Sequence, residues 1–241
     1  RYQPKKSTAW GTLDRQLHGT TMKLEKFPMN EPPTPESFDA NQVASVWRIP
    51  YEERARQARD WARLHKLEPA SADSTKTWLL LIDVQNTFCI PGFELYVGGR
   101  SGRGAVEDNT RLSRFIYRNL GGITHISATM DTHQTMQVFH AIFFVDKEGN
   151  HPAPYTDIHA ADLKNGTWTF NPALASEFGI APDYGQQMML HYAEALEKKG
   201  KYALTVWPYH AMLGGIGHAP VSSIEEALFF HSIARNTQYE V

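Results

Sequence analysis

Three side chains of the types that bind divalent metals follow two apolar segments of this sequence. Asp131 and His133 come directly after segment 123–129, and His210 comes shortly after segment 202–206. If both segments are parallel strands, their carboxyl ends lie along one edge of a sheet, where such folds bind their ligands. One carboxylate and two imidazoles with open positions suit Zn²⁺ first, and also Fe²⁺ or Mn²⁺. The spacing predicts such a metal site. The alternative is that Asp131 caps the following segment and both histidines are polar loop residues.

A further candidate is Asp83, which stands at the end of the apolar run 78–82. A carboxylate at the carboxyl end of a strand lies at the ligand-binding edge of a parallel sheet. The alternative for Asp83 is a turn-forming residue after the strand. Cys89 follows closely and is a weak candidate for a nucleophile, because its thiol need not face Asp83. His140 is the other histidine considered for the site, and the remaining histidines are expected to be structural or exposed.

These residues need a parallel sheet to position them. The run 78–82 has no polar alternation, which predicts a strand buried on both faces. Residues 134–183 are expected to be irregular and to cover the site. The other expected elements are strands at 123–129 and 202–206, and helices at 51–66, from Asp108 or Asn109 to Leu120, at 186–198, and from Ser222 or Ser223 to Arg235. This order of strands and helices predicts a right-handed parallel α/β fold.

The first part of the chain has a different character. Residues 1–49 are polar and rich in proline, which predicts an extended arm on a surface or a partner. We therefore divide the chain into an arm with an amphipathic helix (1–76) and an α/β domain (77–241). The glycine-rich loop between residues 91 and 104 lacks the Lys-Ser/Thr ending of a phosphate-binding loop. It is expected to be a flexible connection over the site.

The composition excludes several classes of function. The 241 residues carry a formal net charge of -2, which gives no basic surface for nucleic acid. No stretch approaches the roughly 20 apolar residues of a membrane span, and the first residues do not show the charged-then-apolar pattern of a signal sequence. The single cysteine excludes an internal disulfide and suits the reducing cytoplasm. We therefore expect a cytoplasmic protein that binds neither nucleic acid nor membrane.

Three segments together resemble the motifs of the nicotinamidase/isochorismatase-like cysteine hydrolase superfamily, in their order and spacing. They are 83–88 (Asp-Val-Gln-Asn-Thr-Phe), 130–133 (Met-Asp-Thr-His) and 206–210 (Val-Trp-Pro-Tyr-His), the last followed by 214–217 (Gly-Gly-Ile-Gly). The resemblance covers about residues 77 to 241. It implies a Rossmann-like, doubly wound parallel sheet flanked by helices, the isochorismatase-like hydrolase fold.

The resemblance also implies a Cys-Asp-Lys triad that hydrolyses the C–N bond of a small amide. Asp83 matches the aspartate that takes the thiol proton, and Phe88 matches an aromatic residue that lines the substrate pocket. Asp131, His133 and His210 match the metal ligands of nicotinamidases. Isochorismatase-type members lack this metal site, so the resemblance favours the amidase branch, and it suggests a homo-oligomer.

Several positions depart from the pattern of nicotinamidases. Thr132, Gln134 and Ala211 stand where tryptophan, proline and cysteine are usual, and the loop 134–183 is longer, so the substrate need not be nicotinamide. The triad lysine and cysteine have no counterpart, and the chain stops near the place expected for the lysine. We therefore expect a sequence shortened at its C-terminus, whose parent is an enzyme. The alternatives are an isochorismatase-type hydrolase of a non-amide compound and a non-catalytic family member used for assembly.

Overall fold

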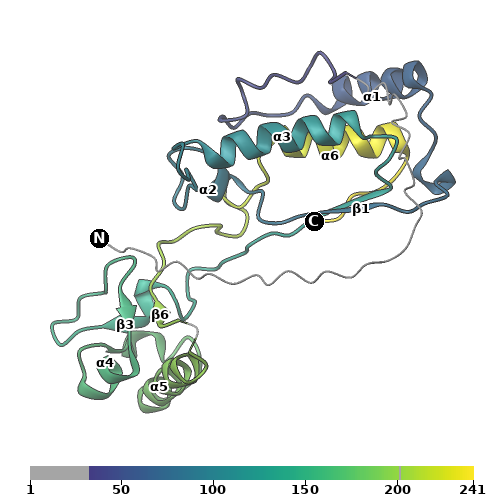
Figure 1. Ribbon diagram of the computed structural model, residues 1–241. Helices are drawn as coiled ribbons and strands as arrows, with labels where there is room; N and C mark the ends of the chain where they lie inside the picture. Colours follow the sequence, from purple (N-terminus) through teal and green to yellow (C-terminus); the bar gives the residue numbers. More distant parts are fainter. Residues whose placement is uncertain (1–32, 201) are drawn as a thin grey trace, which may run out of the picture. The chain divides into compact units, whose positions relative to one another are not determined.

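The computed structural model describes residues 33–200 and 202–241. The expectations for most of the N-terminal arm therefore lie outside the described residues. Helices and strands are both present, in a mixed α/β arrangement (Figure 1). The helices are α1 (Tyr51–His65), α2 (Asn86–Cys89), α3 (Gly104–Arg118), α4 (Ala160–Asn165), α5 (Pro182–Lys198) and α6 (Ser222–Arg235), with short 3-10 turns η1 (Ala70–Ala72), η2 (Ala141–Phe143) and η3 (Pro172–Leu174). The strands are β1 (Trp78–Leu81), β2 (His125–Ala128), β3 (Phe144–Val145), β4 (Asp157–Ile158), β5 (Thr169–Phe170) and β6 (Leu204–Thr205).

One hydrophobic core is built on a parallel pair of strands. β1 pairs with β2 in the register Trp78↔His125 to Leu81↔Ala128. Helix α6 packs against both α1 and α3, and these three helices lie in layers beside β1 (Figure 1). Leu81 and Ile126 pack in the same core as residues of these helices. The expected helices at 51–66 and 222–235 are thus confirmed, because their apolar stripes meet one another.

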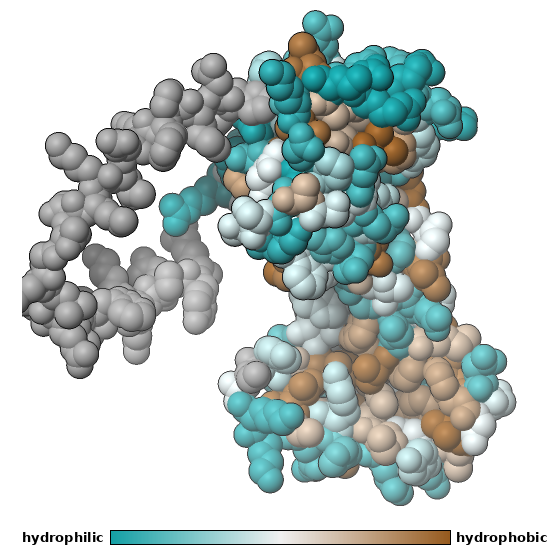
Figure 2. All heavy atoms as spheres, turned by 90° about the vertical axis from the view of Figure 1, so that its right-hand side faces the viewer, coloured by the Kyte–Doolittle hydropathy of each residue, from teal (hydrophilic) through white to brown (hydrophobic). Residues whose placement is uncertain are grey.

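The outer surface of α1 agrees with its amphipathic pattern. Its basic and acidic side chains form the continuous hydrophilic area at the top of the molecule in Figure 2, while Ala55 and Ala58 are buried. No helix among the described residues is long and apolar enough to cross a membrane.

Strand β1 is not buried on both faces, as its apolar run predicted. Trp78, Leu80 and Ile82 have 67%, 54% and 66% of their surfaces exposed, whereas Leu81 is buried. The reason is the alternation of side chains along a strand. Alternate residues face the core that α3 and α6 cover, and the described residues leave the opposite side of β1 open.

The segment 202–206 does not join the parallel sheet. Its strand β6 pairs antiparallel with β4, in the register Asp157↔Thr205 and Ile158↔Leu204. Burial alternates along this segment, with Leu204 and Val206 inside, which is typical of a sheet with one solvated face. Beside β2 lies instead Glu240, in an isolated parallel bridge to Ser127. The β1–β2 sheet is therefore small and parallel, and the described strands do not form a doubly wound sheet.

Residues 134–183 are folded, not irregular. Antiparallel β3 and β5 place Phe144 opposite Phe170, and α4 packs on α5, around a second core of buried apolar side chains. Local polarity and prolines concealed these short elements, because two-residue strands have no period to detect.

Two helices begin earlier than expected. Helix α3 starts at Gly104. Asn109, which was expected to cap the helix, is instead buried within it. Helix α5 starts at Pro182, a residue that suits the first position of a helix because its φ is fixed and no amide hydrogen is lost.

Residues 33–49 lie along the helices of the first core. The backbone N–H of Trp47 donates to the hydroxyl of Ser222, which in turn donates to the carbonyl of Trp47. The ring centroids of Phe38 and Tyr117 lie 5.7 Å apart. The described part of the predicted arm is thus held on α3 and α6.

Candidate metal centre

The structure brings the three predicted metal ligands together. One ligand atom each from Asp131, His133 and His210 lies within 4.8 Å of the other two. Nε2 of His133 is 2.8 Å from the carboxylate of Asp131, and Nε2 of His210 is 3.2 Å from it. The side chain of His210 is only 6% exposed and that of Asp131 29%, so the site opens to solvent on the carboxylate side.

The route by which His210 reaches the site differs from the prediction. Three parallel strand ends along one edge were expected, but β6 is antiparallel to β4 and lies outside the β1–β2 sheet. The residues after the strands pair directly instead. The N–H of His133 donates to the carbonyl of Ala211 (3.0 Å), and the N–H of Leu213 donates to the carbonyl of His133 (2.9 Å). Ala211 has a positive φ of 46°, which turns the chain sharply after His210.

The second nitrogen of each imidazole fixes its tautomer. Nδ1 of His210 lies 2.7 Å from the carbonyl oxygen of Pro208, which can only accept, so Nδ1 carries the hydrogen. Nδ1 of His133 lies 2.9 Å from Oε1 of Gln137. The N–H of Gln134 also donates to this Oε1 (3.2 Å), which identifies it as the acceptor. When such a ring is neutral, its Nε2 therefore carries a lone pair.

These lone pairs give a test of whether a cation fits. Two Nε2 acceptors point at the same acceptor group, the Asp131 carboxylate, and two acceptors in contact repel each other. A divalent ion among the three groups turns this repulsion into attraction. The hydrogen bonds from Nδ1 to a carbonyl and an amide are the outer contacts that metal-binding histidines usually make. The donor set therefore fits a divalent metal.

Gln85 holds the backbone of the first ligand. It is fully buried, and its Oε1 accepts the N–H of Asp131 at 2.7 Å. Its Nε2 donates to the carbonyls of Asp131 and His218, both at 2.8 Å. One amide thus joins the end of β1, the end of β2 and the loop after His210.

A cavity of about 320 Å³ lies against the three ligands. The ring centroids of Phe88 and His210 are 5.9 Å apart, and those of Phe139 and His133 are 4.9 Å apart. Leu95 and Trp207 complete the lining. The volume falls in the lower part of the range for small-molecule sites, and mainly apolar walls with a few polar groups are typical of them.

Asp83 is not among the residues that line this cavity. It is exposed and has a positive φ of 55°, so it forms the turn after β1. Its N–H donates to the hydroxyl of Thr129 (3.2 Å), and that hydroxyl donates to the carboxylate of Asp83 (3.1 Å). The structure therefore places Asp83 beside the site's strands without bringing it to the metal ligands.

Cys89 and His140 are both buried. The sulfur of Cys89 lies 3.8 Å from the backbone oxygen of Asp83, and burial raises the pKa of the thiol, which disfavours the reactive thiolate. His140 has its ring 5.9 Å from that of His133, but it is outside the group of ligand atoms. Burial lowers the pKa of His140, so its ring is neutral, and Nδ1 bonds the carbonyl of Thr135 at 3.0 Å.

The sequence analysis did not identify Gln85, Gln137, Phe139 or Trp207 as parts of the site. Gln137 follows His133 by four positions, a spacing that could have suggested a contact. Gln85 had no such signal, because nothing in a sequence distinguishes a buried amide from an exposed one.

Comparisons with known proteins give no further identification. No family model, no curated protein and no solved structure matches this chain.

Proposed function

We propose that this chain carries the metal-binding part of a hydrolase for small amides, of the nicotinamidase type. The observation that carries the proposal is the set of two imidazole lone pairs and one carboxylate directed at a common point. The aromatic wall beside it supports the same conclusion, because Phe88 and Phe139 stand next to the ligands. The motifs of residues 83–88, 130–133 and 206–210 supply the reaction class.

Each residue has a defined task in this proposal. Asp131, His133 and His210 hold the divalent ion, which, when bound, supplies a Lewis acid that orients and polarises an oxygen or a ring nitrogen of the substrate. Gln85 and Gln137 keep the ligands in position through their hydrogen bonds. The aromatic rings around the cavity displace water from the substrate.

The nucleophile is a separate matter. The enzymes that the motifs resemble attack the amide carbonyl with a cysteine thiolate, whose proton goes to the aspartate at the position of Asp83. Cys89 does not fit this role, because its thiol is buried and its pKa is raised. The proposal therefore assigns the metal, the pocket and the aspartate to this chain, and no nucleophile.

Metal content and amide hydrolysis test the proposal. The full-length protein loaded with Zn²⁺ should hold about one ion per chain, and His210→Ala should lose it. His125→Ala is the matched control, because His125 is half-buried in β2 and outside the ligand group. Release of ammonia from nicotinamide and other small amides should stop in Asp83→Ala. Equal metal content in both histidine variants, or full activity in Asp83→Ala, contradicts the proposal.

A second function is favoured by the position of Asp83. Its carboxylate accepts a hydrogen bond from Thr129 and does not line the cavity. A non-catalytic family member, which binds its ligand at the metal without covalent chemistry, agrees with this position. Metal-dependent binding of an amide without release of ammonia distinguishes this function from hydrolysis.

A further inference from the structure

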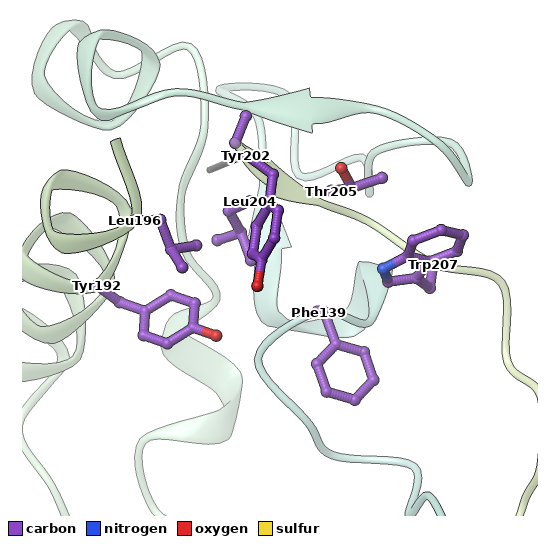
Figure 3. A pocket seen from close by; sticks show the side chains of 8 residues that line it. Phe139, Tyr192, Leu196, Tyr202, Leu204, Thr205 and Trp207 are labelled. Carbon is purple, nitrogen blue, oxygen red and sulfur yellow. The ribbon is translucent and has the colours of Figure 1, made fainter. Parts of the chain in front are cut away.

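A second cavity adjoins the metal cavity. It has a volume of about 390 Å³ and lies between the end of α5 and strand β6 (Figure 3). Both cavities are lined by Phe139 and Trp207. These two residues are joined by their backbones, because the N–H of Trp207 donates to the carbonyl of Phe139 at 2.8 Å. The shared wall is therefore a fixed part of the fold.

The same wall lies beside the metal ligands. The ring centroids of Phe139 and His133 are 4.9 Å apart, and those of Trp207 and His210 are 6.4 Å apart. A molecule that lies across Phe139 and Trp207 thus reaches both the ligands and the second cavity.

The lining of the second cavity selects an uncharged group. Tyr192, Leu196, Tyr202 and Leu204 line it together with Phe139 and Trp207, and no charged side chain among the described residues does. Figure 3 shows the hydroxyl groups of Tyr192 and Tyr202 pointing into the space between the rings. Aromatic rings of this kind bind another ring by edge and face contacts.

The two tyrosine side chains are also exposed to solvent. Tyr192 is 40% exposed and Tyr202 is 66% exposed. Among the described residues neither hydroxyl has a hydrogen-bond partner. The hydroxyl of Thr205, also in the lining, is already committed, since it donates to the carboxylate of Asp157 at 2.5 Å. Polar atoms of a ligand therefore meet the two tyrosine hydroxyls, and its apolar part covers rings that water now contacts.

We propose that the substrate is the amide of an acid with a large, uncharged, aromatic group. The amide lies at the metal ligands, and the acyl group crosses Phe139 and Trp207 into the second cavity. This inference rests on the proposed function, because it extends the same site. It also gives a reason for an amidase in which the substrate need not be nicotinamide, since a single small ring leaves the second cavity empty.

Two metal-chelating probes that share one head group test the inference. Acetohydroxamate presents the head alone, and 3-phenylpropanohydroxamate adds a phenyl ring on the acyl side. Titration calorimetry on the Zn²⁺-loaded protein measures both dissociation constants. Burial of the ring should make the second probe bind about 10- to 100-fold more tightly than the first.

Tyr202→Ala should remove most of this ratio, because it opens one wall of the cavity at a side chain that contributes little to the core. Tyr184→Ala is the matched control, since Tyr184 is an exposed tyrosine of α5 outside the lining, and it should keep the ratio. Zinc content and thermal unfolding of each variant show that fold and metal are retained. A ratio near one in the wild type, or an unchanged ratio in Tyr202→Ala, overturns the inference.

Hydrolysis of acetamide and 3-phenylpropanamide by the full-length protein separates this inference from the proposed function. Preference for the phenyl compound in binding, without release of ammonia from either amide, refutes hydrolysis and supports the cavity assignment. Hydrolysis of both amides at equal kcat/KM, with equal binding of the two hydroxamates, supports the hydrolase and refutes the cavity assignment.

Discussion

Replacing Gln85 by methionine should damage both the fold and the metal site. Methionine has nearly the same volume, so the change removes hydrogen bonds without leaving a cavity. Three bonds are lost: one from the N–H of Asp131 and one each to the carbonyls of Asp131 and His218. At about 1 kcal/mol for each bond, the free energy of unfolding should fall by roughly 3 kcal/mol.

For a chain of 241 residues this loss corresponds to a fall in Tm of about 6 to 12 °C. Because Gln85 orients the backbone of a ligand, the Kd for Zn²⁺ should also rise roughly 10- to 100-fold. Calorimetric melting of the metal-free protein gives the first quantity, and titration with Zn²⁺ gives the second. Gln134→Met is the control, since Gln134 is an exposed glutamine next to His133.

The two measurements are independent tests of the same contacts. A lower Tm with a Kd for Zn²⁺ within twofold of the wild type refutes the positioning role of Gln85. An unchanged Tm refutes the hydrogen bonds themselves.

Three further substitutions probe the fold. Asp73→Ala should lower the free energy of unfolding by about 3 kcal/mol, because the buried guanidinium of Arg235 loses a carboxylate 2.5 Å away. A loss of under about 1 kcal/mol in chemical denaturation refutes this. Burial holds the pKa of His231 below its ordinary value of 6.5, so the unfolded chain takes up the extra proton and stability falls as the pH drops below about 6.5. His231→Gln should flatten this fall by up to about 1.4 kcal/mol per pH unit, and equal slopes in pH-dependent denaturation contradict it. Gly185→Ala should destabilise by about 1 to 3 kcal/mol, since its methyl group would overlap the ring of Phe170; a higher Tm, the usual result inside a helix, contradicts it.

Local signals explain what the sequence predicted well. The stripe of apolar residues and the acidic first turn of α1 act within a few residues of each other, and the helix forms where they indicate. Asp131, His133 and His210 were grouped from their side-chain types and their places after apolar segments, and their ligand atoms lie within 4.8 Å of one another; that they bind a metal stays a prediction. Chemistry of this kind is visible in a sequence because the ligand types are few.

Pairing between distant segments explains what the sequence did not predict. Segment 202–206 is apolar enough for a parallel strand, but its partner, β4, is a two-residue strand inside a polar loop. Nothing local to either segment specifies that pairing or its direction. The same holds for Gln85, whose partners Asp131 and His218 are 46 and 133 residues away.

The turn at Asp83 is a further example. Its positive φ is a property of the backbone, which an aspartate tolerates more readily than most residues. The sequence analysis considered a turn-forming role and a catalytic role for Asp83. The hydrogen bonds to Thr129 agree with the first, and the second stays a prediction.

The burial of Cys89 has a practical consequence. It is the only cysteine of the sequence, and it lies in the core beside β1. A thiol reagent therefore modifies the native protein only when this region opens, so the rate of labelling measures the free energy of that opening under native conditions. A cysteine introduced at an exposed position can be labelled against an almost silent background. A fluorophore attached to the introduced cysteine can therefore report on the protein while Cys89 is kept.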